Sequence, residues 1–205
     1  MYTDSYSSHS LNYLCDLLCA AVKRERAEEY SRALLMRYGT LEAILSANIA
    51  DLEDIAGKNA AMLIKVAAHV TGRRSTDKMQ SGRVYGQREI CEYLKALFIA
   101  DSEEKIYAVT LGKDGEYIAT HLVSHGTVNT SEVMPRKFAE CAVNDRAAKV
   151  IIAHNHPGGT TIPSADDIRF TGKVASVFSV SGVEFLYHVI VAGQEARILN
   201  LGDVL

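Results

Sequence analysis

Apolar positions in the first third of the chain recur with the period of an α-helix. The pattern after residue 29 stops at Gly39, a residue type that commonly ends helices. Thr40 is a suitable N-cap for a short helix that follows. The next stretch predicts a short helix, a turn at Gly57 and a longer helix that ends near Gly72. We therefore expect a small all-α domain over residues 1–72.

Residues 73–83, RRSTDKMQSGR, are polar and charged and contain no aliphatic run. Such a composition is typical of a linker. Its basic side chains could touch a phosphate backbone, but a solvated connection is the simpler interpretation.

From residue 84 onward, helical stretches alternate with apolar stretches of strand length. The expected helices are YGQREICEYLKALFIA, PRKFAECAVNDRA and PSADDIRFTGKVASVFSV. The expected strands lie on both sides of the hairpin signal Asp114-Gly115, in AKVIIAH and in VEFLYHVIVAG. This alternation predicts an α/β domain over residues 84–205, with helices flanking a central mixed sheet.

Composition excludes several classes of protein. The chain has 205 residues, an apolar fraction of 48% and a net charge of −3, which suit a globular protein of one or two domains. Residues 1–83 carry eleven Lys/Arg and ten Asp/Glu, and residues 84–205 carry eleven and fifteen, so neither half has the basic footprint of a dedicated nucleic-acid binder. No apolar run is long enough for a transmembrane helix, and the N-terminus lacks the basic start of a secretory signal. We expect a cytoplasmic protein without membrane contact. The four cysteines lack CxxC spacing and are expected to be buried thiols.

The stretch HNHPGGTTIPSADD, residues 154–167, carries the candidate chemistry. Alternate residues of a strand face the same way, so His154 and His156 can reach one point while Asn155 faces away. Neutral imidazole is a common zinc ligand, and a carboxylate can supply a third ligand. Asp167 is the candidate third ligand. Alternatively, Ser164 and Asp167 only cap a helix, as in a capping box.

The same stretch resembles the JAMM (MPN-plus) metalloprotease signature, His-x-His-Pro, six residues, then Ser-x-x-Asp. Within that family it looks like the bacterial RadC branch, with SHGTVN and PRK upstream as supporting stretches. The resemblance covers residues 84 to about 200. It implies a JAMM/MPN-like mixed sheet with cytidine-deaminase-like layering and one Zn²⁺ per chain, held by His154, His156 and Asp167.

The resemblance also implies a glutamate on an early strand that acts as general base toward a metal-activated water. Glu104 fits that position best, and Glu103 is the neighbouring alternative. Ser164 would donate a hydrogen bond to the oxyanion of a tetrahedral intermediate. The implied substrate is a peptide or protein, cleaved at a peptide or isopeptide bond.

Two positions depart from the RadC pattern. Lys137 stands where an acidic residue is usual, and Tyr187 stands where Asp usually precedes the histidine of the last core strand. Neither change touches the proposed ligands, so they bear on substrate fit and on the orientation of the ligands. We expect His188 itself to be a plain strand residue rather than a donor to the site.

The N-terminal region is similar to helix-hairpin-helix DNA-binding modules, but its hairpin is degenerate. IAGKNAAML keeps Gly57 and Lys58 and lacks the second glycine of the usual Gly-x-Gly. In that motif the backbone N–H groups meet phosphate. Gly57 and Lys58 are therefore candidate DNA contacts, and a packing domain without a ligand is the alternative.

Three functions are compatible with these observations. The leading hypothesis is a zinc-dependent hydrolase of peptide or isopeptide bonds. The second is a DNA-associated repair or recombination factor whose metal site is non-catalytic. However, a structural zinc site normally has four protein ligands, and only three are found here. The third is a metal-dependent nuclease of the HNH type, which we rank last because the three letters are adjacent on one strand end.

Overall fold

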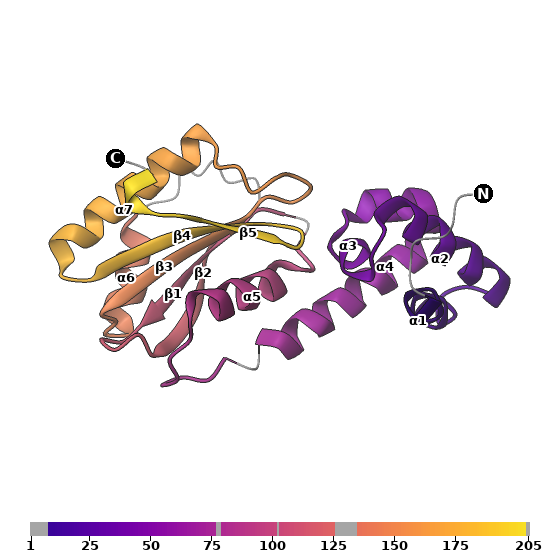
Figure 1. Ribbon diagram of the computed structural model, residues 1–205, viewed down its shortest axis with the longest axis horizontal. Coiled ribbons are helices and arrows are strands. Elements are labelled where there is room, and N and C mark those ends of the chain that lie inside the picture. Colours follow the sequence, from indigo (N-terminus) through magenta and orange to yellow (C-terminus); the bar gives the residue numbers. More distant parts are fainter. Residues whose placement is uncertain (1–7, 77–78, 102, 126–134, 204–205) are drawn as a thin grey trace.

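The computed structural model describes residues 8–76, 79–101, 103–125 and 135–203. Figure 1 shows a helical part beside an α/β part built around a sheet. The helical part consists of α1 (Ser8–Leu18), α2 (Arg24–Tyr38), α3 (Leu41–Ser46) and α4 (Ile49–Thr76).

The boundary between α2 and α3 lies where the sequence predicts it, although α2 begins earlier than the apolar pattern indicated. Gly39 follows α2 with a φ of 79°, a conformation that costs glycine little. The Thr40 hydroxyl then accepts a hydrogen bond from the Ala43 N–H at 3.1 Å and caps α3. Apolar side chains from all four helices, Leu34 among them, meet in one core.

Helix α4 confirms the turn at Gly57 and corrects its predicted end. Gly57 interrupts the helix with a φ of 75° and a ψ of 164°. The helix continues past Gly72 to Thr76, so the first residues of the predicted linker are helical, and residues 77–78 lie outside the described part. A Cβ atom at Gly72 would lie 2.6 Å from the Ala96 carbonyl oxygen of α5 (Gln87–Phe98). Glycine at this position therefore lets α4 and α5 pack closely instead of ending the helix.

The α/β part holds a five-stranded mixed sheet in the order β2-β1-β3-β4-β5. Among the described strands, β3 and β4 pair in parallel and the other three pairs are antiparallel. The remaining elements are β1 (Lys105–Leu111), β2 (Tyr117–His125), α6 (Arg136–Asn144), β3 (Lys149–Asn155), α7 (Ala165–Ser181), β4 (Glu184–Ala192), β5 (Glu195–Leu199) and a terminal 3-10 turn, η2 (Leu201–Asp203).

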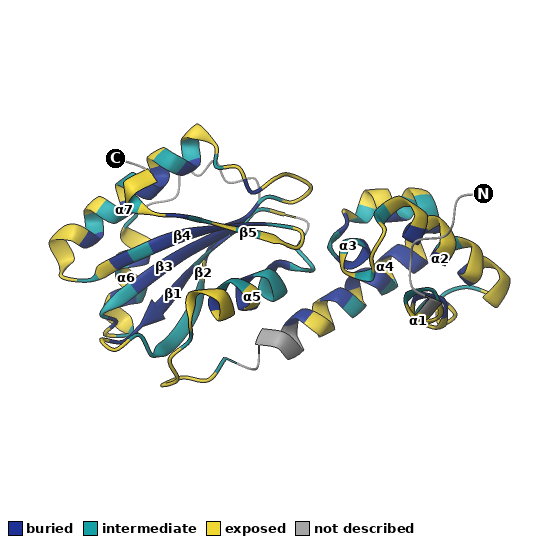
Figure 2. Cartoon of the chain, in the orientation of Figure 1, coloured by how far each residue is buried: buried dark blue, intermediate teal, exposed yellow. Residues whose placement is uncertain are grey.

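Helices cover both faces of this sheet (Figure 1), and its central strands are buried (Figure 2). Along β3, Val150 and Ile152 pack with α6 and α7, whereas Ile151 and Ala153 pack with α5. This alternation follows from the two-residue period of a strand that is buried on both faces. It also directs the next residue, His154, toward α7.

The mixed sheet with flanking helices confirms the predicted fold class, although some local predictions were incomplete. Strand β5 was not predicted. Cys15 is buried as expected, but Cys19 is exposed and Cys91 and Cys141 are only partly buried. The supporting stretch SHGTVN lies mostly outside the described residues.

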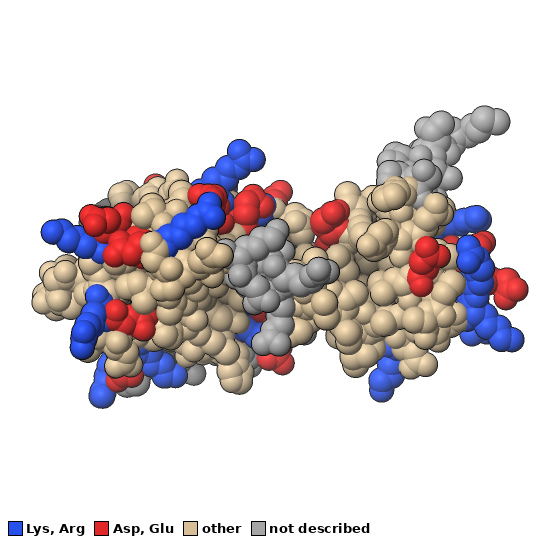
Figure 3. Space-filling view, turned by 90° about the horizontal axis from the view of Figure 1, so that it is seen from below, with Lys and Arg blue, Asp and Glu red and all other residues tan. Residues whose placement is uncertain are grey.

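The surface carries charges of both signs. Figure 3 shows basic and acidic side chains interspersed on the face in view, in both parts of the molecule. Within the described residues, every helix is too short or too polar to span a lipid bilayer.

Candidate metal centre

The end of β3 brings two imidazoles together. His154 is fully buried, and its Nε2 lies 2.8 Å from the Nε2 of His156, the first residue after the strand. The chain then turns at Gly158, which has a φ of 69°. The His156 Nδ1–H donates to the Thr160 carbonyl oxygen at 2.7 Å, so the turn itself orients this ring.

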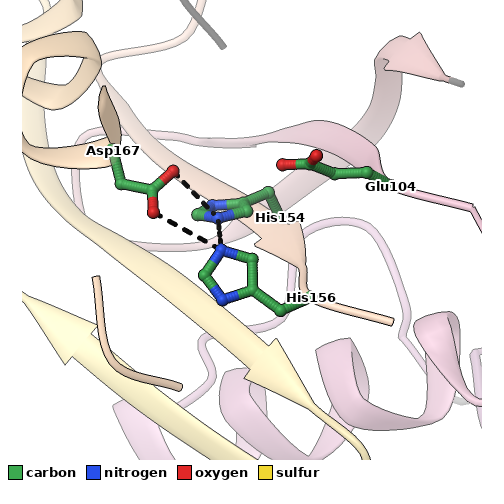
Figure 4. A group of neighbouring side chains, drawn as sticks. All are labelled: Glu104, His154, His156 and Asp167. Carbon is green, nitrogen blue, oxygen red and sulfur yellow. Dashed lines mark hydrogen bonds and ion pairs between the residues drawn. The ribbon is translucent and has the colours of Figure 1, made fainter. Parts of the chain in front are cut away.

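Asp167 approaches the same point from the first turn of α7. Its Oδ1 lies 3.2 Å from the His154 Nε2, and its Oδ2 lies 3.4 Å from the His156 Nε2 (Figure 4). The Ser164 N–H and hydroxyl both donate to Asp167 Oδ2, at 2.8 and 2.7 Å. The predicted capping box is therefore present, and the same bonds orient the carboxylate toward the histidines.

Glu104 completes the cluster from the segment before β1. It is half-buried, and its carboxylate and the ligand atoms of His154, His156 and Asp167 all lie within 4.8 Å of one another. Figure 4 shows Glu104 and Asp167 approaching His154 from opposite sides. Glu103, the alternative, is exposed and does not belong to this cluster.

Asn155, between the two histidines, holds the segment that carries Glu104. Its Oδ1 accepts from the Lys105 N–H at 2.7 Å, and its Nδ2 donates to the Glu103 carbonyl oxygen at 3.0 Å. Asn155 faces away from the imidazoles as predicted, but the sequence did not indicate this contact. Both bonds hold the backbone next to Glu104, one on each side. They therefore fix the point from which the Glu104 side chain extends.

The electrostatics of the cluster favour an anionic Asp167. Burial raises the pKa of Asp167, but the neighbouring imidazoles of His154 and His156 and the hydrogen bond from Ser164 outweigh burial and bring this pKa far below its usual range. The neighbouring Asp167 carboxylate raises the pKa of His156, against the effect of burial. Burial also raises the pKa of Glu104, an effect that the nearby imidazoles oppose.

The donor set fits a small divalent cation. Two imidazole nitrogens and one carboxylate oxygen are zinc ligands, and tetrahedral ligands about 2.0–2.1 Å from zinc lie about 3.3 Å from one another. The distance of 3.2 Å between His154 Nε2 and Asp167 Oδ1 matches that spacing, and the distance of 2.8 Å between the two Nε2 atoms requires only a small separation of the rings.

Ser164 is close to the cluster but is already engaged. Its hydroxyl accepts a hydrogen bond from the Asp167 N–H at 3.1 Å and donates one to Asp167 Oδ2. A hydroxyl has one proton, so the predicted oxyanion contact requires the bond to Oδ2 to break first. The oxyanion role of Ser164 stays a prediction.

The expectation that His188 is a plain strand residue was wrong. His188 lies in β4, is fully buried, and places its Nε2 2.7 Å from the His154 Nδ1. Its Nδ1 lies 2.7 Å from the hydroxyl of Thr171 on α7. Burial, and then the neighbouring His154, lower the pKa of His188 well below its usual value. The sequence signals were the match of His188 to the histidine of the last core strand in the RadC pattern and the spacing of Thr171, one helical turn after Asp167.

The helical part borders this centre without supplying a residue to the cluster. A narrow cleft is lined by Ser46 at the end of α3, by Asp101 and by residues 156–158. Gln194, in the turn between β4 and β5, donates to the Ser46 hydroxyl at 3.3 Å. The candidate DNA contacts, Gly57 and Lys58, are exposed on α4 and do not belong to the cluster.

Comparisons with known proteins found a matching family model and relatives that cover most of the chain. The model of a family described as the RadC-like JAB domain matches residues 84–200. A UPF0758 protein of Neisseria meningitidis is 31% identical over 187 residues, which cover 90% of this chain and 83% of that protein. A UPF0758 protein of Cupriavidus taiwanensis is 31% identical over 189 residues, which cover 91% and 83% of the two chains.

Proposed function

The chain belongs to the RadC-like JAB domain family, and on this premise we propose that it is a zinc-dependent hydrolase of peptide or isopeptide bonds. The family and the fold support a metal-dependent site in general terms. The identity of the metal, the reaction and the roles of individual residues are parts of the proposal.

One observation carries it: two imidazoles, one carboxylate and a second carboxylate converge on one point. We assign the metal to the first three groups and the role of base to the second carboxylate. The first three come from His154, His156 and Asp167, and the fourth is Glu104. Three protein ligands leave a coordination position for water, which distinguishes catalytic from structural zinc sites. A half-buried glutamate beside that position is suited to move protons.

Bound zinc would lower the pKa of a water molecule to about 7 and polarise the substrate carbonyl. Glu104 would accept the proton of that water and deliver it to the leaving nitrogen. Ser164 would stabilise the oxyanion after turning its hydroxyl away from Asp167. Asn155 would keep Glu104 in place during both transfers.

The first experiment measures the metal content of the purified protein by elemental analysis. We expect about one zinc per chain, because the three proposed ligands form one site. The zinc should be lost in His154→Ala and in Asp167→Ala. His69→Ala is the matched control, because His69 is an exposed histidine outside the cluster. Wild-type protein that takes up no zinc after addition of zinc would overturn the proposal.

The second experiment separates binding from catalysis with a neighbouring pair of glutamates. Fluorogenic amide and isopeptide substrates are incubated with the zinc-loaded wild type, Glu104→Gln and Glu103→Gln. General-base removal should slow cleavage by Glu104→Gln by about 10²–10⁴-fold. Glu103→Gln should cleave at the wild-type rate, since Glu103 is exposed. Equal rates in the two variants would exclude Glu104 as the base, and absence of cleavage by the loaded wild type would contradict the hydrolase.

The second candidate function is a DNA-associated role in repair or recombination. It is favoured by the break in α4 at Gly57, which has non-helical backbone angles and is followed by the exposed Lys58. A backbone turn next to a lysine is the kind of feature that contacts phosphate. Gel-shift measurements with duplex and branched DNA test this role independently of zinc.

A further inference from the structure

A chain of hydrogen bonds leads from one proposed ligand back to the backbone of another. It starts at the His154 Nδ1, which lies 2.7 Å from the His188 Nε2. It continues from the His188 Nδ1 to the Thr171 Oγ1, at 2.7 Å. It ends where the Thr171 hydroxyl lies 2.6 Å from the Asp167 carbonyl oxygen. His154, His188 and Thr171 are all fully buried, so water does not compete for these bonds.

The direction of the chain follows from counting protons. A carbonyl oxygen can only accept, so the Thr171 hydroxyl donates its single proton to Asp167. The Thr171 oxygen must then accept from His188, which places the His188 proton on Nδ1. A neutral imidazole carries one N–H, so the His188 Nε2 accepts from the His154 Nδ1–H. The His154 Nε2 is thereby left with a free lone pair that points at His156 and Asp167.

The reverse direction is incompatible with a metal. If the Thr171 hydroxyl turned to donate to His188, the His188 Nε2 would carry the proton and donate to His154. The His154 proton would then sit on Nε2, which lies 2.8 Å from the His156 Nε2 and 3.2 Å from Asp167. A protonated nitrogen has no lone pair for a cation. Only one of the two directions therefore leaves His154 able to act as a ligand.

His156 reaches the same condition by a shorter route. Its Nδ1–H donates directly to the Thr160 carbonyl oxygen at 2.7 Å. His154 has an imidazole in place of a carbonyl, and an imidazole can either donate or accept. A further partner must therefore fix the protonation of His188, and Thr171 occupies that position. The ring of Phe170, 6.0 Å away between centroids and tilted by 68°, packs against the imidazole of His188.

We propose that His188 and Thr171 are positioning residues that hold His154 in the Nδ1–H tautomer and so present its Nε2 to the metal. The inference rests on the metal site of the proposed function. It assigns to β4 and α7 a task that the three ligands and Glu104 do not perform. Outer partners of this kind typically change metal affinity by about 10–100-fold when removed.

The first test compares two substitutions at one position. Thr171→Val keeps a branched side chain of similar size and removes the hydroxyl, whereas Thr171→Ser keeps the hydroxyl. Zinc affinity is measured by competition with a chromophoric chelator, and circular dichroism checks the fold. We expect a loss of affinity of about 10–100-fold in Thr171→Val and nearly wild-type affinity in Thr171→Ser. Equal affinities of the two variants would overturn the proposal.

The second test reads the protons directly and needs no variant. Long-range ¹H–¹⁵N correlation spectra of the zinc-loaded wild type report which ring nitrogen of each histidine is protonated. We expect His154 and His188 both to carry the proton on Nδ1. A proton on the Nε2 of His188 would overturn the proposal even if Thr171→Val fails to fold.

These readouts distinguish the proposed relay, the hydrogen-bond chain through His188 and Thr171 that fixes the His154 tautomer, from the proposed hydrolase. If the wild type binds zinc with the expected tautomers but cleaves no amide, the hydrolase is wrong and the relay stands. If zinc-loaded wild type cleaves amides while its His188 carries the proton on Nε2, the relay is wrong and the hydrolase stands. Wild-type protein that binds no zinc would overturn both.

Discussion

The helical part and the α/β part bury different kinds of groups. Among the described residues, the helical part buries two polar side chains, Ser31 and Lys65, within an otherwise apolar core. The Lys65 ammonium donates to the Leu45 and Ala47 carbonyl oxygens at 3.2 and 3.0 Å and so caps the C-terminal end of α3. Its burial lowers the pKa of Lys65, an effect that Asp101 opposes.

The α/β part instead buries a connected polar group at one end of β3. The set comprises His154, Asn155, Asp167, Thr171 and His188, each hydrogen-bonded within the set or to a nearby backbone. Burying polar groups costs free energy that hydrogen bonds only partly return. Packing of apolar side chains therefore stabilises the helical part, whereas the α/β part combines its own apolar cores with a buried polar centre at the end of β3.

The largest effect should come from the apolar core of the helical part. Leu34→Ala removes a side chain that is 0% exposed and should lower the free energy of unfolding by about 2–5 kcal/mol. Urea denaturation measures the loss. Met36→Ala on the same helix is the control, because Met36 is 87% exposed and should change stability by less than about 0.5 kcal/mol. If Leu34→Ala also weakens zinc binding in the folded protein, the core of the helical part supports the metal centre as well.

Bound zinc should raise the stability of the α/β part and leave that of the helical part unchanged. At about 100 times its Kd, bound zinc should stabilise the α/β part by about 2.7 kcal/mol. Hydrogen exchange should then slow in β3 and α7 and stay unchanged in α1 and α2. Magnesium is the control cation, since it prefers oxygen ligands in an octahedral arrangement. Protection that spreads equally over α1 and α2 would contradict the distinction between the two parts.

Asn155→Ala should lower the free energy of unfolding by a smaller amount. Its main effect should be on the rate of amide cleavage. The substitution leaves the Lys105 N–H and the Glu103 carbonyl without their partner, at a cost of about 1–3 kcal/mol. Because the side chain of Asn155 grips the segment around Glu104 and not the histidine rings, amide cleavage should slow more than zinc affinity falls. Asn155→Asp keeps the acceptor for the Lys105 N–H but sets a carboxylate oxygen against the Glu103 carbonyl oxygen, so it should not restore the activity. A proportional loss of zinc affinity and activity would show that Asn155 acts on the ligands instead.

The sequence predicted the parts of this centre that local rules determine. A strand of period two places His154 and His156 on one side, and a serine three residues before Asp167 marks a helix start. Both features depend on residues that are close in the chain. The fold class followed similarly from alternating apolar stretches, and the turn at Gly57 followed from a single glycine.

Contacts between distant segments were not predictable in this way. The approach of His188 to His154 requires β3 and β4 to pair in parallel with Ile152 opposite His188, and the pairing contains an irregularity after Val150. No local pattern specifies that register. The predicted helix end at Gly72 was wrong for a similar reason. A glycine late in a helical pattern resembles a helix end, but Gly72 allows a close contact with Ala96 of another helix.

The smallest expected effect concerns DNA and again sets one part against the other. If the turn at Gly57 contacts a phosphate, Lys58→Ala should weaken binding of duplex DNA and make the slope of log K against log salt about 0.9 less steep. Lys113→Ala is the matched control, because Lys113 is also an exposed lysine beside a glycine-containing turn, in the α/β part. Fluorescence anisotropy at several salt concentrations measures both slopes. Equal slopes for the wild type and both variants would assign the helical part a packing role, which its apolar core and its contact with α5 already support.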